Sequence, residues 1–176
     1  MPRPLISLLI FLLLATPAYA ASHPGATPHA CIDLDSFGGS HFPARVVAVA
    51  DGDTITVEPI QGGDRVRVRL QGIDAPEINQ PYGQAARAFV SEAVLYKEVH
   101  LASERNDRYG RIVAVVEVPG AGVLQELLLE AGLAWVWPQF CRDCGEWKAL
   151  EEAARGQGLG LWADESPVPP WEWRRK

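Results

Sequence analysis

The chain has 176 residues, 48% of them hydrophobic, which is enough to build the core of one folded domain. Its formal net charge is −6, and it would become −7 without residues 1–20, in which Arg3 is the single charged side chain. Non-specific coating of nucleic acid depends on many Lys and Arg side chains placed beside phosphates. The acidic balance therefore argues against a protein that simply coats DNA.

The first twenty residues have the three parts of a secretory signal peptide. Arg3 supplies a positive start, Leu5–Leu14 is an apolar run, and Ala18-Tyr19-Ala20 is a small-x-small cleavage signal. The apolar run is short for a transmembrane helix, so an uncleaved membrane anchor is the weaker alternative. We expect an exported protein, periplasmic or secreted, with no membrane segment in its mature form.

Residues 21–43 contain three prolines and the Gly38-Gly39 pair, with little periodicity. This composition predicts an exposed N-terminal segment. The periodic part of the sequence predicts one folded domain over residues 44–163. Residues 164–176 are rich in proline and tryptophan and are expected to form a C-terminal tail.

Five short stretches have the composition of strands: apolar and polar side chains alternate in three of them, and the other two, residues 45–50 and 112–118, are nearly continuous apolar runs. In the clearest stretch, three arginines alternate with Val66, Val68 and Leu70 before Pro76, which has no N–H to give to a sheet. Strands are predicted over residues 45–50, 54–59, 65–70, 98–103 and 112–118.

Helical spacing of apolar residues occurs in three other stretches. It predicts helices over residues 83–97, 123–131 and 146–155, the second and third followed by Gly132 and Gly156. One helix inserted after the third strand, with two more after the fifth, predicts an α+β fold.

Carboxylates follow two of the predicted strands at their turns. Asp51 and Asp53 lie after the first strand, and Asp74 and Glu77 lie after the third, which ends near Arg69. Carboxylate oxygens from separate turns can hold a hard cation, and an arginine fork can bind a phosphate through two hydrogen bonds. The simpler interpretation of any one of these features is a solvated acidic turn.

Three motifs occur together and in order: Asp-Gly-Asp-Thr at 51–54, Arg-Leu-Gln-Gly-Ile-Asp-Ala-Pro-Glu at 69–77, and Asp-Arg-Tyr-Gly-Arg at 107–111. In this combination the sequence resembles the staphylococcal nuclease family over about residues 45–162. The resemblance implies a five-stranded OB-fold barrel with about three helices. It also implies Ca²⁺ as the cofactor, and cleavage of DNA and RNA that leaves 3′-phosphates.

The resemblance also implies a role for each matching residue. Asp53 and Asp74 would be side-chain ligands of Ca²⁺, and the backbone carbonyl of Ala75 the third protein ligand. Glu77 would position or deprotonate the attacking water, while Arg69 and Arg111 would clamp the phosphate.

Three further residues are expected to assist. Asp51 would support the metal ligands from outside, although a plain turn-forming role fits it as well. Tyr109 would stack on or hydrogen-bond the nucleotide, and Arg108 would meet backbone phosphates.

One stretch departs from the family pattern. Residues 135–140, Trp-Val-Trp-Pro-Gln-Phe, occupy a region where the family's reference member has tyrosines against the nucleotide. Stacking tolerates any aromatic face, but a base preference does not carry over.

The first alternative to an enzyme is a non-catalytic OB-fold module that binds nucleic acid. The second is a secreted structural or protein-interaction domain. Retention of all the motif carboxylates and arginines favours the enzyme, expected as a monomer with no stable protein partner.

The sequence has three cysteines, Cys31, Cys141 and Cys144. In an exported protein a disulfide is expected, whereas zinc would need more ligands than the close pair supplies. We favour a local Cys141–Cys144 bridge, because residues 21–43 give no sign of docking. A bridge from Cys31 to either of the other two is the alternative.

Overall fold

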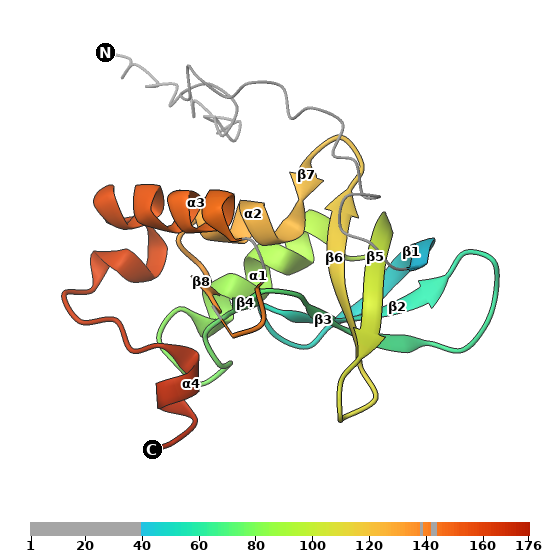
Figure 1. Cartoon of the computed structure of the whole chain (residues 1–176), viewed down its shortest axis with the longest axis horizontal. Coiled ribbons are helices and arrows are strands. Elements are labelled where there is room, and N and C mark those ends of the chain that lie inside the picture. Colours follow the sequence, from blue (N-terminus) through green and yellow to red (C-terminus); the bar gives the residue numbers. More distant parts are fainter. Residues whose placement is uncertain (1–39, 138, 142–143) are drawn as a thin grey trace, which may run out of the picture.

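The computed structural model describes residues 40–137, 139–141 and 144–176 (Figure 1). Five strands form a closed barrel in the order β3-β2-β1-β5-β6, with a parallel pairing of β3 and β6 completing the circle. Helices gather at one side of this barrel (Figure 1). The α+β prediction and the five-stranded barrel are therefore confirmed. The barrel strands are β1 (Ser40–Val49), β2 (Thr54–Pro59), β3 (Val66–Leu70), β5 (Glu98–Asn106) and β6 (Ile112–Val118).

Strand β1 is long because it pairs with two neighbours at different points. Residues 40–45 pair with β5, and residues 44–49 pair with β2. The strand thus begins at Ser40, five residues before the expected start at Arg45, and the exposed segment does not extend to residue 43. Pro43 lies opposite His100 of β5 and one residue before the β2 register begins at Ala44, so it stands outside the two-sided part of the strand.

Helix α1 (Gly83–Val94) packs one face on the barrel. Its buried side chains, Ala86, Val90 and Val94, follow a four-residue spacing. The helix ends three residues before the expected Lys97, because Leu95 is extended and Tyr96 takes a positive φ of 63°. The described residues contain four α-helices in place of about three: α1, α2 (Leu124–Glu130), α3 (Gly145–Gly156) and the short α4 (Pro170–Trp173), with a 3₁₀ helix at Gly160–Ala163.

A second, two-stranded sheet was not expected from the sequence. Strand β4 (Ile73–Asp74) pairs antiparallel with β8 (Trp135–Val136), which places Asp74 opposite Trp135. The N–H of Trp137 then donates to the carbonyl of Gly72 at 2.8 Å. Another short strand, β7 (Gly122–Val123), pairs antiparallel with the end of β6 just before α2 begins. This small sheet ties the expected metal-ligand turn to the residues after α2.

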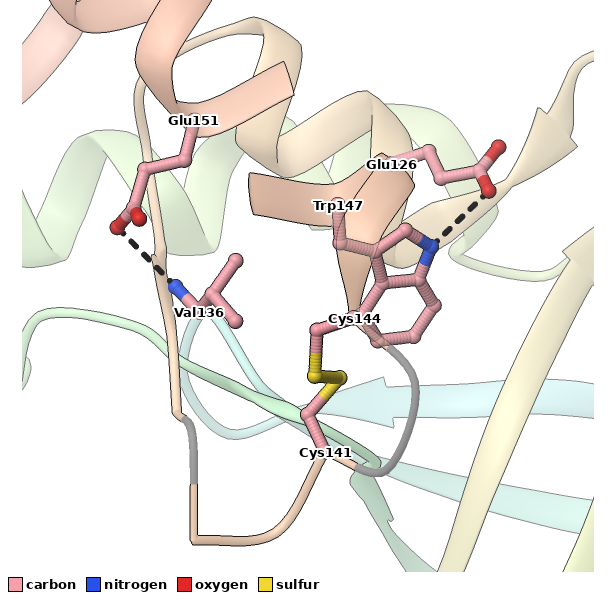
Figure 2. Close-up of a disulfide and its surroundings, with 6 residues drawn as sticks. All are labelled: Glu126, Val136, Cys141, Cys144, Trp147 and Glu151. Carbon is pink, nitrogen blue, oxygen red and sulfur yellow. Dashed lines mark hydrogen bonds between the residues drawn. A yellow bond between two sulfur atoms is a disulfide. The ribbon is translucent and has the colours of Figure 1, made fainter. Parts of the chain in front are cut away.

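Helix α3 is anchored beside the small sheet through a disulfide and two hydrogen bonds (Figure 2). Cys141 and Cys144 are joined, with an S–S distance of 2.00 Å, as the favoured local pairing predicted. Cys31 lies outside the described residues. The indole of Trp147 donates to Glu126 of α2, and Glu151 accepts the N–H of Val136 at 3.2 Å.

Gly72 is required where this anchor meets the barrel. Its φ is +74°, and a Cβ there would lie 2.6 Å from the ring of Trp147 and 3.2 Å from the sulfur of Cys141. A larger residue would push α3 away from the end of β3.

Among the described residues, no helix has the length and apolar character needed to cross a membrane.

Candidate active site

A polar cleft of about 280 Å³ opens where β2 begins and β3 ends. All nine residues that the sequence predicted for metal, catalytic or substrate roles line it, together with Thr54, Pro76, Trp137 and Arg174. The structure therefore brings the three separate motifs into one place. The predicted residues are Asp51, Asp53, Arg69, Asp74, Ala75, Glu77, Arg108, Tyr109 and Arg111.

Arg69 lies at the centre of the cleft and is 9% exposed. Its Nη2 atom is 2.8 Å from Asp74 Oδ1 and 3.1 Å from Asp53 Oδ2, while its Nη1 donates to the Leu70 carbonyl at 2.8 Å. Arg69 faces Thr54 of β2 on one side and Val113 of β6 on the other, so barrel closure fixes its backbone. The two expected ligand carboxylates thus converge on one nitrogen atom.

Asp53 is held rigidly at the start of β2. Its Oδ2 accepts the N–H of Ala75 at 2.8 Å, and its Oδ1 accepts the Thr54 hydroxyl at 3.1 Å. The N–H of Asp53 itself donates to Asp51 Oδ1 at 3.0 Å. Burial and, next, the negative charge of Asp53 raise the pKa of Asp51 to about 6. The Asp51 carboxylate is therefore half-buried and lies directly behind Asp53.

Asp74 is completely buried, at 0% exposure, and both of its oxygens contact arginines. Arg69 contacts Oδ1, and Nη2 of Arg174 contacts Oδ2 at 2.7 Å. Burial raises the pKa of Asp74, while the hydrogen bond from Arg174 and the charge of Arg69 oppose that shift. The two guanidinium groups are what allow a carboxylate to be buried here.

Glu77 lies at the rim of the cleft, with its side chain 35% exposed. Its Oε1 atom is 2.6 Å from Nη1 of Arg174, and its N–H donates to Gln80 Oε1 at 3.1 Å. Gln80 is itself buried and donates to the carbonyl of Val168. Gln80 thus orients the Glu77 turn and links it to the chain before α4.

Arg111 reaches the cleft from the turn between β5 and β6. Asp107 accepts Arg111 Nε at 2.7 Å and the backbone N–H groups of Tyr109 and Arg111 at 2.8 and 2.9 Å. Burial alone would raise the pKa of Asp107, but the hydrogen bonds from Arg111 and Tyr109 lower it overall. The guanidinium groups of Arg108 and Arg111 lie 4.8 and 5.5 Å from the centre of the Tyr109 ring, which is 68% exposed as a residue.

Trp137 forms an aromatic wall between this cleft and a neighbouring one of about 460 Å³. Its ring stacks on Trp171 with centroids 6.4 Å apart and contacts Phe140 edge-on at 4.4 Å. The guanidinium groups of Arg69 and Arg174 lie 6.0 and 5.6 Å from its centroid. Within residues 135–140, Trp137 therefore lines the cleft, and Phe140 lines the neighbouring one.

The donor set fits a hard divalent cation. Asp53, Asp74 and the Ala75 backbone offer only oxygen, which Ca²⁺ prefers, and the two carboxylates point to a common position at Arg69 Nη2. No group of three or more His, Cys, Asp or Glu side chains within the described ranges is arranged to hold a metal by itself. A backbone carbonyl, water and substrate oxygens would have to complete the coordination.

The closed five-stranded barrel and the polar cleft on it are those of an OB-fold hydrolase. Comparison with known proteins leads to the same class. The family model described as staphylococcal nuclease homologue matches residues 67–164. An "Uncharacterized endonuclease" of Escherichia coli is 42% identical over 132 residues, covering 75% of this chain and 84% of that protein. A protein of the same name from Haemophilus influenzae is 40% identical over 132 residues, covering 75% of this chain and 72% of its own length.

"Micrococcal nuclease" of Shigella flexneri is 35% identical over 143 residues, covering 76% of this chain and 81% of that protein. The chain therefore belongs to the staphylococcal nuclease family and is an enzyme of the nuclease class.

Two site residues were missed by sequence reasoning. Arg174 lies 100 residues from Asp74 in the chain, in a segment expected to be a tail, yet it contacts the carboxylates directly. Gln80 positions the Glu77 turn from inside the protein. The available signal for Arg174 was weak: a run of three basic residues after Trp171 and Trp173 in an otherwise acidic protein.

Proposed function

We propose that this nuclease is Ca²⁺-dependent, hydrolyses phosphodiester bonds of both DNA and RNA, and leaves 3′-phosphates. The observation that carries the proposal is the convergence of Asp53, Asp74 and Glu77 with Arg69 and Arg111 in one cleft. A surface acidic turn would not place two carboxylate oxygens within about 3 Å of one buried guanidinium nitrogen.

Asp53, Asp74 and the Ala75 carbonyl would hold Ca²⁺. When bound, the cation supplies positive charge against the negative charge that develops on the phosphate oxygens. Asp51 is not a ligand in this scheme. Its role is electrostatic, since its charge behind Asp53 increases the negative potential at the cation position.

Glu77 would accept the proton of the attacking water. Its rim position leaves it accessible to solvent, and the Gln80 contact fixes its backbone. The water oxygen forms a new bond to phosphorus, and the bond from phosphorus to the 5′-oxygen breaks. The departing 5′-oxygen takes up a proton and becomes the 5′-hydroxyl of one fragment. The phosphate stays on the 3′-oxygen of the other fragment.

Arg69 and Arg111 would bind the phosphate from two sides. Asp107 engages Arg111 through Nε, which orients its terminal nitrogens without using them. Two guanidinium forks can hold equatorial oxygens in fixed geometry, which a lysine could not reproduce. Arg108 and the exposed ring of Tyr109 would contact the flanking nucleotides, and stacking of this kind tolerates any base.

A plasmid cleavage assay tests the proposal directly. Purified protein should nick and linearise plasmid DNA in Ca²⁺, degrade RNA likewise, and lose both activities in excess chelator. Mg²⁺, which demands a small strict octahedron, should replace Ca²⁺ poorly. Full cleavage in excess chelator would reject the metal site, and binding without cleavage in Ca²⁺ would favour the non-catalytic module.

End-group analysis of the products tests the direction of bond cleavage. Fragments should be labelled by a 5′-kinase without phosphatase treatment, and should prime a polymerase only after their 3′-phosphates are removed. Fragments with 5′-phosphates would reverse the assignment of the leaving group. Glu77→Gln is the matched control: it preserves the side-chain shape and removes the proton acceptor, so its preparation should yield few labelled fragments.

We also propose export, on the strength of the predicted signal peptide at residues 1–20, which lies outside the described residues. Amino-terminal sequencing of protein from the exported fraction should begin after Ala20. Recovery of protein that retains residues 1–20 would contradict cleavage.

A further inference from the structure

The residues after the 3₁₀ helix return to the cleft and place an arginine in it. Arg174 Nη2 contacts Asp74 Oδ2 at 2.7 Å, and its Nη1 contacts Glu77 Oε1 at 2.6 Å and Asp74 Oδ1 at 3.3 Å. One guanidinium therefore bridges an expected metal ligand and the expected general base. Burial would lower the pKa of Arg174, but its hydrogen bonds to Asp74 and Glu77 raise it, so the group stays charged.

The segment 164–176 has its own anchors on the domain. Trp171 contacts Trp135 edge-on and stacks on Trp137. Val168 accepts a hydrogen bond from buried Gln80, and Pro170 is buried at the start of α4. Arg174 is therefore delivered to the carboxylates by packing as well as by charge.

This placement conflicts with cation binding. Both oxygens of Asp74 and one oxygen of Glu77 are occupied by the guanidinium groups of Arg69 and Arg174. A divalent ion at Asp74 would place two like charges within a few ångströms, where their repulsion is strong in a partly buried site. Arg174 is the guanidinium on Asp74 Oδ2 and Glu77 Oε1, so a cation that binds at these two oxygens competes with Arg174 directly.

We propose that segment 164–176 is an autoinhibitory strap: Arg174 holds Asp74 and Glu77 in the absence of metal, and Ca²⁺ must displace it to complete the active site. This inference rests on the proposed Ca²⁺ dependence. The apparent dissociation constant for Ca²⁺ then equals the intrinsic one divided by the fraction of molecules whose strap is open. Removing Arg174 therefore tightens Ca²⁺ binding without adding any ligand.

Calorimetric titration with Ca²⁺ tests this on the full chain. Arg174→Ala should bind Ca²⁺ at least about tenfold more tightly than the parent, which corresponds to an open fraction of about one tenth or less. Arg174→Lys, which keeps the charge but loses the fork, should fall between them. Arg175→Ala is the matched control: it removes the same charge from the next, exposed position and should change the affinity less than about twofold.

Tryptophan fluorescence gives a second readout that does not depend on cleavage. Arg174 lies 5.6 Å from the ring centre of Trp137, which stacks on Trp171. Adding Ca²⁺ should change the emission of the parent and of Arg175→Ala at the concentration that saturates binding. The change should be much smaller in Arg174→Ala, where no guanidinium leaves the ring. Circular dichroism confirms that each variant is folded before it is compared.

The outcomes separate the two proposals. Equal Ca²⁺ affinity in Arg174→Ala and Arg175→Ala would overturn the strap and leave the Ca²⁺-dependent nuclease standing. Weaker nucleic-acid binding by Arg174→Ala with unchanged Ca²⁺ affinity would overturn it too, and would make Arg174 a substrate contact. Absence of Ca²⁺ binding in every variant would reject the proposed Ca²⁺ dependence, and the strap with it.

Discussion

Asp51 allows a direct test of how much negative charge the cleft holds when no divalent cation is bound. Its carboxylate is half-buried and accepts the N–H of Asp53 at 3.0 Å. Burial, followed by the charge of Asp53, raises the pKa of Asp51 from 3.8 to about 6. We predict that Asp51→Asn stabilises the protein in chelator above pH 6, because asparagine keeps an acceptor oxygen and removes the charge.

The sign follows from proton linkage. Between pH 4 and pH 6 the unfolded chain has already released the Asp51 proton while the folded protein still holds it. The stability contributed by this group therefore falls as pH rises through this window and stays low above it. One pKa unit corresponds to about 1.4 kcal/mol, so the shift to about 6 gives an upper limit of about 3 kcal/mol. The gain from Asp51→Asn should be smallest near pH 4 and approach that limit at pH 7.5.

Urea denaturation of the parent and Asp51→Asn at a series of pH values, in chelator, measures this difference. Asp64→Asn is the matched control, since it removes a carboxylate from the exposed turn between β2 and β3. The free energy of unfolding of the control should track the parent at every pH. If the two Asn variants gave parallel curves from pH 4 to pH 7.5, the burial argument for Asp51 would be wrong. Added Ca²⁺ should shrink the gain, because the cation compensates the charge.

Three further changes address the roles in the cleft and the disulfide. Glu77→Gln should keep Ca²⁺ binding and lower the turnover number about 10²–10⁴-fold, as steady-state kinetics would measure; near-parental turnover rules out a proton-accepting role. Arg69→Lys and Arg111→Lys should each lose about 10²–10³-fold in turnover although charge is kept, and parental rates in both would refute the phosphate clamp. Replacing Cys141 and Cys144 by serine should cost about 2 kcal/mol in thermal or urea unfolding, the loop-closure value for so short a loop, and leave cleavage intact; a folded but inactive variant would contradict this.

The barrel strands could be predicted because their signal is local. Val66, Val68 and Leu70 alternate with arginines, and the resulting strand lies within one residue of its predicted limits. The same locality placed Asp53 and Asp74 at the turns that follow such strands. Closure of the barrel brings those turns together. Their proximity could be predicted only from the resemblance to a known family, because no local pattern shows that the barrel closes.

Other features depend on contacts that leave no local pattern. Strands β4 and β8 have two residues each, too few to show a period, and they form only because each supplies the other's hydrogen bonds. The first four residues of β1 include Pro43, which alone argues against a strand, yet pairing with β5 extends the strand through it. In both cases tertiary pairing overrides the local preference of the sequence.

The place of Arg174 follows from charge balance in the cleft, although no local pattern predicts it. Asp74 is fully buried, and Arg69, its neighbour on β3, is shared with Asp53. One guanidinium cannot neutralise both carboxylates and Glu77 as well, so the folded protein needs a further cation at this position. Arg174 supplies it from the far end of the sequence, at the two carboxylates where the proposed Ca²⁺ would act. The proposed strap requires a cation that can leave the cleft, and Arg174, whose side chain is 39% exposed, meets that requirement.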